Sequence, residues 1–119
     1  MGENIVVEKS KKFAVQIIEL YKILQDEKKE YVLSKQILRS GTSIGANVKE
    51  AIRGQSRADF RAKMSISLKE ASETEYWLEL LYETKFIDKD IFEKLYSDNK
   101  ELLKLLTSIV KSSSRTKKE

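Results

Sequence analysis

Seven basic side chains recur at helical spacing in the middle of the chain, and their chemistry suits the binding of phosphate groups. Between Ser34 and Lys63 seven bases stand against two acids, Glu50 and Asp59, which gives this segment a charge of +5. The bases are Lys35, Arg39, Lys49, Arg53, Arg57, Arg61 and Lys63. Cations along a helix face can neutralise successive phosphates and release their counterions. The pattern therefore favours RNA or DNA as a ligand, bound through its backbone because nothing resembles a base-reading module.

The charge is segregated along the chain, and this opens a second interpretation. Between Glu70 and Glu101 ten acids stand against four lysines, a local charge of −6, within a whole-chain charge of +4. A basic surface of one copy could dock on the acidic surface of another and set the register of an oligomer. Both surfaces are also compatible with ordinary solvated faces. The charge pattern alone leaves these alternatives open.

Most enzyme chemistry is excluded by residue types that are missing. The chain has no cysteine and no histidine, which removes disulfides, thiolate nucleophiles, imidazole triads and histidine-containing zinc or di-iron sites. Glu75, Glu79 and Glu83 recur every four residues, but like charges in that pattern are usually a solvated strip. We therefore expect a protein that is not an enzyme, with no catalytic residue, no metal and no cofactor.

The elements that must position the basic residues are predicted to be helices. The 119 residues contain no proline and only 4 glycines, and apolar residues recur with a helical period, so one all-α domain is expected. The predicted helices cover residues 9–27, 32–53, 57–84 and 89–111, with Ser56 as the cap of the third. The polar segment 112–119 is predicted to be a disordered tail. Short turns between the helices imply an antiparallel up-down-up-down four-helix bundle over residues 1–111.

The third predicted helix is apolar on two sides, which favours self-association. One stripe should face the core and consists of Phe60, Met64, Ser67, Ala71, Leu78 and Tyr82. Ile66, Trp77 and Leu80 cluster on a different side. A second apolar surface containing tryptophan is typical of a subunit interface. The alternative is that Trp77 fills a wide boundary between two helices of the same copy.

Polar and small residues inside the apolar stripes predict tight, specific packing. Ser43, Asn47, Glu50 and Glu75 are predicted to form a structural hydrogen-bond network that fixes helix register. Ser40 and Ser67 are further candidates for this network. Gly41 and Gly45 are spaced to admit the backbone of a neighbouring helix, at a cost of about 1 kcal/mol each in helix propensity.

Three segments together resemble a known family. They are the run from Leu38 to Ala51, the segment from Ser56 to Phe60, and residues 69–78. The chain resembles, over nearly its whole length, the bacterial four-helix bundle family of ribosomal-RNA intervening-sequence proteins. By match to the family motif, Arg39, Ser43, Asn47 and Glu50 are its structural signature. Ala51 departs from the pattern, because many relatives place glycine directly after the motif glutamate.

The resemblance also implies an assembly and a partner class. Members are expected to form five-fold rings, and a similar bundle, the accessory variability protein of diversity-generating retroelements, forms a basic ring that contacts a reverse transcriptase and nucleic acid. The amino end has no apolar run of signal-peptide length and the sequence has no uninterrupted apolar span of about 18 residues, so we expect a cytoplasmic protein that does not enter a membrane. With the resemblance, this predicts a homo-oligomer, a pentamer, that binds RNA or DNA. The alternative is a protein-interaction hub whose ring docks a partner protein, with charge segregation serving self-assembly.

Overall fold

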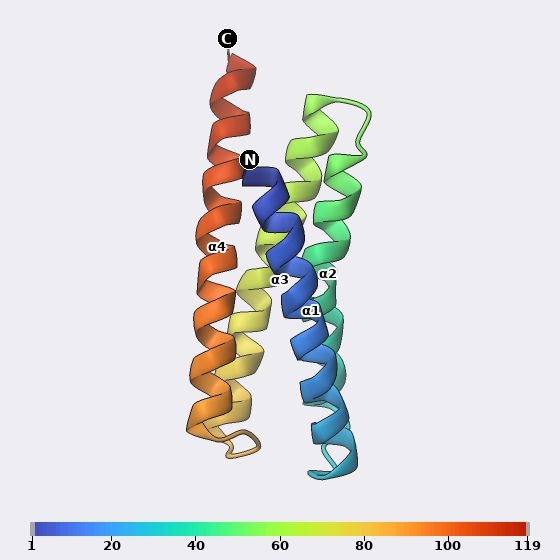
Figure 1. Cartoon of the computed structure of the whole chain (residues 1–119), viewed down its shortest axis with the longest axis vertical. Coiled ribbons are helices and arrows are strands. Elements are labelled where there is room, and N and C mark those ends of the chain that lie inside the picture. The colour runs from blue at the N-terminus through green and yellow to red at the C-terminus, as the bar shows by residue number, and fades with distance from the viewer. Residues whose placement is uncertain (1, 119) are drawn as a thin grey trace.

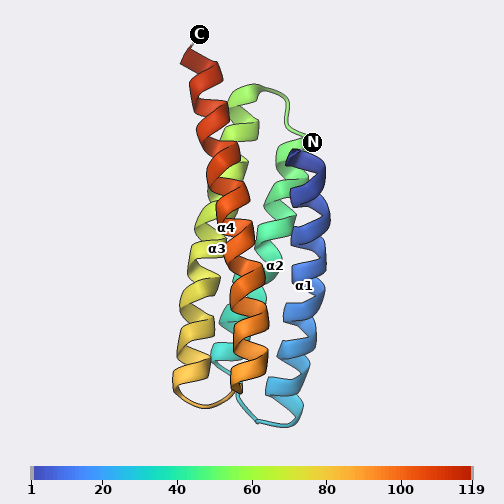
Figure 2. The same ribbon diagram turned by 60° about the vertical axis from the view of Figure 1, so that its left-hand side comes forward.

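Four antiparallel helices form an elongated bundle. The computed structural model describes the backbone of residues 2–118 and the side chains of residues 4–113. The helices are α1 (Gly2–Asp26), α2 (Leu33–Ile52), α3 (Arg57–Glu83) and α4 (Lys89–Lys118), within a body of 51 × 21 × 20 Å (Figure 1). Contacts join α1 to α2, α2 to α3, α3 to α4 and α4 back to α1, as the turned view in Figure 2 also shows. The predicted all-α up-down-up-down four-helix bundle is confirmed.

One apolar stripe from each helix supplies the core. Fully buried side chains include Phe13 and Ile17 of α1, Ile44 of α2, Met64 of α3 and Leu106 of α4. Because these residues recur every three or four positions, they line the side of each helix that faces the bundle axis.

Two residues expected on the core stripe of the third helix lie closer to the surface. Phe60 is only partly buried, near the start of α3. Tyr82 is also exposed, because its ring leans outward and stacks on Phe92 of α4 with 4.4 Å between ring centroids.

Local side-chain caps define where the helices begin. Ser56 Oγ accepts a hydrogen bond from the Asp59 N–H at 3.1 Å, so the predicted cap of α3 is confirmed. Asp88 Oδ1 accepts from the Ile91 N–H at 2.9 Å and starts α4 in the same way. The Glu30 carboxylate accepts from the N–H groups of Leu33 and Ser34 at 2.9 and 2.7 Å, which satisfies donors that the first turn of α2 leaves open.

Two helices are longer than the sequence pattern predicted. α1 begins at Gly2 instead of residue 9, because Val6 and Ser10 in its first turns are buried against the bundle. α4 continues to Lys118 instead of ending at 111, so the segment predicted as a disordered tail is helical up to that residue. No proline or glycine interrupts this stretch, and Ser113 is buried with its Oγ donating to the Ile109 carbonyl at 2.9 Å. Glu119 lies outside the described residues.

Glycine lets α1 and α2 approach closely. A Cβ on Gly41 would lie 2.8 Å from Cγ1 and 3.2 Å from Cβ of Ile17. A Cβ on Gly45 would lie 3.3 Å from Ser10 Oγ. The close approach predicted for these two glycines is therefore present within one chain, and it is tighter at Gly41.

Candidate nucleic-acid interface

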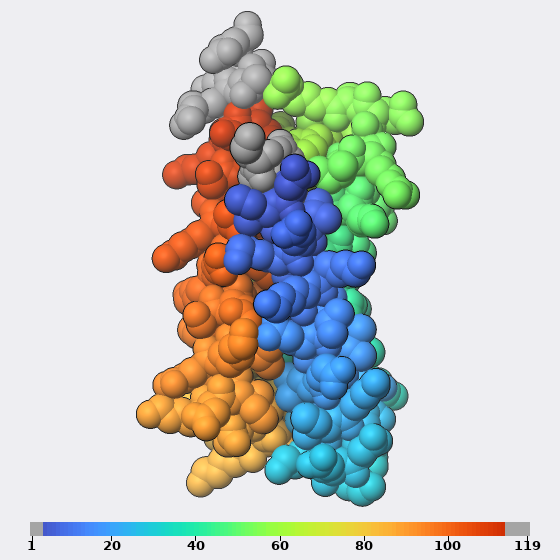
Figure 3. Space-filling model, in the orientation of Figure 1, coloured from blue at the N-terminus to red at the C-terminus, as the bar shows by residue number. Residues whose placement is uncertain are grey.

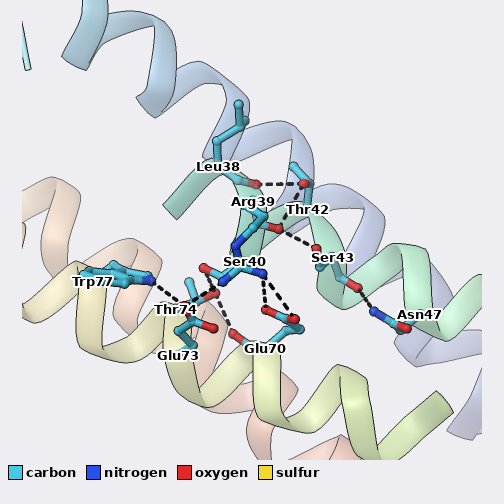
Figure 4. Close-up of polar contacts among 10 residues, drawn as sticks. All are labelled: Leu38, Arg39, Ser40, Thr42, Ser43, Asn47, Glu70, Glu73, Thr74 and Trp77. Carbon is cyan, nitrogen blue, oxygen red and sulfur yellow. Dashed lines mark hydrogen bonds and ion pairs between the residues drawn. The ribbon is translucent and has the colours of Figure 1, made fainter. Parts of the chain in front are cut away.

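The seven predicted basic residues do not form one continuous surface, because two of them are neutralised by α2–α3 ion pairs. Arg39 Nη1 lies 3.2 Å from Glu70 Oε1, and Arg39 Nη2 lies 2.6 Å from Glu73 Oε2 (Figure 4). Lys63 Nζ lies 2.8 Å from Glu50 Oε1. The Arg39 hydrogen bond lowers the pKa of Glu73, and the Glu50 hydrogen bond raises the pKa of Lys63. These two cations tie α2 to α3 and present little unmatched charge to a ligand.

A third predicted cation is displaced along the bundle. Lys35 lies in the first turn of α2, whereas Arg53 follows the last residue of that helix. A helix of this length is about 30 Å long at 1.5 Å per residue. Lys35 therefore lies at the end of the bundle opposite to Arg53 and cannot share one local surface with it.

The remaining four bases gather at one end of the bundle, around the turn between α2 and α3 (Figure 1). We call them the basic corner: Lys49, Arg53, Arg57 and Arg61. Within residues 4–113 no carboxylate lies within 4.0 Å of any of their charged groups. Lys49, Arg53 and Arg57 are exposed, and Arg61 is half-buried. Cations free of acidic partners retain their full charge for an anionic ligand.

Arg61 differs from the other three cations in its surroundings. Its Nε atom is buried and has no hydrogen-bond partner among the described residues. A buried donor without a partner costs about 1–3 kcal/mol. Because Nε is shielded from solvent, Arg61 would contact a phosphate through the part of its side chain that remains exposed.

The predicted polar network is not assembled as one unit. Ser43 Oγ donates to the Arg39 carbonyl at 2.6 Å and Asn47 Nδ2 donates to the Ser43 carbonyl at 2.8 Å, so both bonds stay within α2. Glu50 pairs with Lys63 of α3, and Glu75 pairs with Lys100 of α4 at 2.7 Å. The four residues therefore act at three separate places, of which only the two ion pairs join different helices.

A different polar cluster, which the sequence reasoning largely missed, joins α2 to α3 (Figure 4). Thr74 Oγ1 lies 2.8 Å from Ser40 Oγ and 2.8 Å from the Glu70 carbonyl, with Ser40 and Thr74 both fully buried. Nearer the turn between α2 and α3, Ser67 Oγ donates to the Ile44 carbonyl at 2.8 Å. Thr74 lies seven residues after Ser67, on the same face of α3. This spacing is the feature of the sequence from which Thr74 could have been predicted to join Ser40 and Ser67.

The three residues predicted at an oligomer interface have different environments. Ile66 is 40% exposed, whereas Trp77 and Leu80 are half-buried. The Trp77 indole donates to Glu73 Oε2 at 3.2 Å and packs against the core. Within one copy, Trp77 thus occupies the helix boundary described by the alternative interpretation. The large apolar side chains of α3 that are most exposed to solvent are instead Ile66 and Tyr76, which is 54% exposed.

Glu79, in the acidic segment of α3, is engaged by a side chain of α4. The Tyr96 hydroxyl donates a hydrogen bond to Glu79 Oε2 at 2.8 Å, and this hydrogen bond, assisted by burial, raises the pKa of Tyr96 to about 12.

Among the described residues, no group of three or more carboxylates is arranged to hold a metal ion. Over the same part of the chain, none of the helices has an apolar stretch that could cross a membrane.

Comparison with known proteins identifies a family and a similar crystal structure. The family model described as 23S rRNA-intervening sequence protein matches residues 2–108. The fold is similar to the crystal structure of a protein of unknown function from the S23 ribosomal protein family of Bacteroides thetaiotaomicron, with a TM-score of 0.92 and 58% sequence identity. That alignment covers 93% of this chain and 99% of the other. No curated protein matches the chain.

Proposed function

We propose that this chain, which belongs to the family of 23S rRNA-intervening sequence proteins, is a non-enzymatic homo-oligomer that binds the phosphates of RNA or DNA. The observation that supports this most strongly is the basic corner. Four cations from α2, α3 and the turn between them meet at one end of the bundle, and within the described side chains no acid neutralises them. Cations of this kind bind nucleic acid mainly through its backbone charge.

The corner predicts binding that does not depend on base sequence. Its cations lie on helix ends and a turn, with no element shaped to enter a groove and read base edges. Each phosphate neutralised contributes about 0.7 to 0.9 to the slope of log affinity against log salt. Four contacts per copy therefore predict a slope of about −3.

Self-association accounts for the apolar side chains that a single copy leaves exposed. Ile66 and Tyr76 of α3 and Val15 and Ile18 of α1 are all more than a third exposed. Because α1 and α3 lie diagonally across the bundle and do not contact each other, these side chains belong to two separate surfaces, and neighbouring copies on both sides would cover them. A five-membered ring, as the family resemblance implies, would also repeat the basic corner and so bind one long strand at several points.

The test is a titration of fluorescently labelled RNA and DNA, single-stranded and duplex, at low salt. Wild type should bind, and Arg53→Glu/Arg57→Glu should weaken binding by about tenfold or more. The matched control is Lys28→Glu/Lys89→Glu, which makes the same charge change at the opposite end of the bundle and should weaken binding by less than about threefold. Absence of binding by the wild type, or an equal loss in both variants, would contradict the proposal.

A second candidate is a hub that docks a partner protein through the exposed apolar surface of α3. The observation that favours it is the exposure of Ile66 and of Tyr76, whose ring centroid lies 5.3 Å from that of the half-buried Trp77. A pull-down after nuclease treatment separates the two functions. The hub predicts a partner protein that Ile66→Asp loses and Arg53→Glu/Arg57→Glu retains, whereas nucleic-acid binding predicts no partner once nucleic acid has been digested.

A further inference from the structure

The last turns of α4 lie at the same end of the bundle as the basic corner. α4 runs antiparallel to α3, so its C-terminal half ends beside the α2–α3 turn (Figures 1 and 2). In the space-filling view of Figure 3, the late α4 residues and the α2–α3 turn both stand at the upper end of the molecule. α4 carries two further lysines that the basic corner does not include, Lys104 halfway along the helix and Lys111 nearer this end.

The outer side of this half of α4 is an open, nearly flat surface with a shallow depression between its side chains. It is lined by Lys100, Leu103, Lys104, Thr107, Ser108 and Lys111. Lys104 and Lys111 are seven residues apart and so share one face of the helix, with the two hydroxyls between them. We call Lys104, Thr107, Ser108 and Lys111 the α4 patch.

The charges of the patch are free, unlike that of the neighbouring Lys100. Lys100 Nζ is 2.7 Å from Glu75 Oε2 and lies over the ring of Tyr96. For Lys104 and Lys111, no acid lies within 4.0 Å among the side chains of residues 4–113. Both lysines are exposed. The patch thus offers two unmatched cations.

The hydroxyls of the patch are also free, unlike several other hydroxyls of the bundle. Ser43, Thr84 and Ser113 donate to the carbonyl four residues earlier, at 2.6, 2.6 and 2.9 Å. Thr107 and Ser108 have no hydrogen-bond partner of this kind among the described residues, and both are exposed. A hydroxyl without a backbone partner can donate to a phosphate oxygen beside a lysine.

We propose that the α4 patch is a second phosphate-binding site, which holds the same nucleic-acid strand as the basic corner. This inference rests on the proposed function and extends it from α2 and α3 to α4. The bundle is only about 20 Å across. A stacked strand rises about 3.4 Å per nucleotide, so about six nucleotides span this end of the molecule.

The test compares Lys104→Glu/Lys111→Glu with wild type and with the control Lys28→Glu/Lys89→Glu, using the same labelled RNA and DNA over a series of salt concentrations. Loss of two phosphate contacts should reduce the slope of log affinity against log salt by about 1.5 and weaken binding by about tenfold at low salt. Thr107→Ala/Ser108→Ala should weaken binding by about threefold without changing the slope, because it removes no charge.

The outcomes separate this inference from the proposed function. If Arg53→Glu/Arg57→Glu weakens binding while Lys104→Glu/Lys111→Glu binds like wild type with an unchanged slope, the α4 patch is not a site and the basic corner stands. If wild type binds no nucleic acid, both fail. If the lysine variant instead forms a smaller assembly by light scattering and keeps its salt slope, the patch is a contact between copies and the inference is overturned. Unchanged circular dichroism and Tm verify the fold.

Discussion

Arg39 of α2 donates a hydrogen bond across the helix boundary to Glu73 of α3, with 2.6 Å between Nη2 and Oε2. The same carboxylate oxygen accepts from the indole of Trp77 at 3.2 Å, and Glu70 engages the other nitrogen of the guanidinium. Arg39, the arginine of the family motif, therefore holds α2 against α3. Its charge is neutralised within the chain by two carboxylates.

We predict that Arg39→Ala leaves nucleic-acid binding nearly unchanged while lowering the free energy of unfolding slightly. The side chains of Arg39 and Glu73 are 49% and 37% exposed, so solvent screens the pair and the loss should stay below about 1 kcal/mol. Chemical denaturation measures the stability and the labelled-RNA titration measures binding. A loss of affinity as large as that of Arg53→Glu/Arg57→Glu would show that Arg39 contacts the ligand.

The same ion pair predicts a pH dependence. The hydrogen bond from Arg39 lowers the pKa of Glu73 in the folded chain. A depressed carboxylate pKa contributes stability that is present above the unfolded value of about 4.3 and is lost as the pH falls through the lower folded value. Wild type should therefore lose more stability than Arg39→Ala as the pH is lowered from 5 to about 3. Parallel stability curves over this range would contradict the assignment.

Gly41 and Gly45 should respond differently to the same substitution. Gly41→Ala places its Cβ 2.8 Å from Cγ1 and 3.2 Å from Cβ of Ile17, so a change of rotamer cannot clear it. We expect destabilisation of up to about 2 kcal/mol after the gain in helix propensity. Gly45→Ala, whose nearest contact is at 3.3 Å, is the control and should be neutral or stabilising by up to about 1 kcal/mol. Thermal unfolding of both variants gives the comparison, and equal effects would refute the packing argument.

Asn99 of α4 is fully buried and only half satisfied. Its Nδ2 donates to the Ala71 carbonyl at 2.9 Å, while Oδ1 has no hydrogen-bond partner among the described residues. Replacing it by an apolar residue of similar size removes the unsatisfied acceptor, so Asn99→Leu should raise the free energy of unfolding by about 1–2 kcal/mol. Asn99→Asp keeps the shape but buries a carboxyl group, and it should be destabilised. Destabilisation of both variants in urea titrations would mean that the amide is fully satisfied.

Tyr96 gives the bundle a pH dependence on the alkaline side. Its hydrogen bond to Glu79 and its burial raise its pKa from 10.0 to about 12. A raised pKa contributes stability that is present below the unfolded value and is lost as the pH rises through the folded value. The stability difference between wild type and Tyr96→Phe should therefore shrink between pH 10 and about 12. A difference that stays constant over this range would contradict the assigned hydrogen bond.

Helical periodicity allowed the architecture to be predicted, because core residues such as Ile44 and Met64 recur with the turn of the helix. Periodicity could not reveal which lysine and arginine side chains lack an acidic partner in the fold. Arg39 and Glu73 are 34 residues apart, and their pairing depends on the register of α2 against α3. The α4 patch was missed for a similar reason: Lys104 and Lys111 follow the acidic segment in sequence, and only the antiparallel course of α4 directs this half of the helix toward the end that carries the basic corner.

Mapping where nucleic acid touches the chain tests the account most directly. A single-stranded RNA carrying photoreactive nucleotides is bound to the intact protein, cross-linked with light, and the modified peptides are identified by mass spectrometry. The account predicts cross-links in residues 49–63, around the basic corner, and in residues 100–113, which contain the α4 patch. Cross-links confined to the opposite end, in residues 26–36 and 84–94, would contradict it.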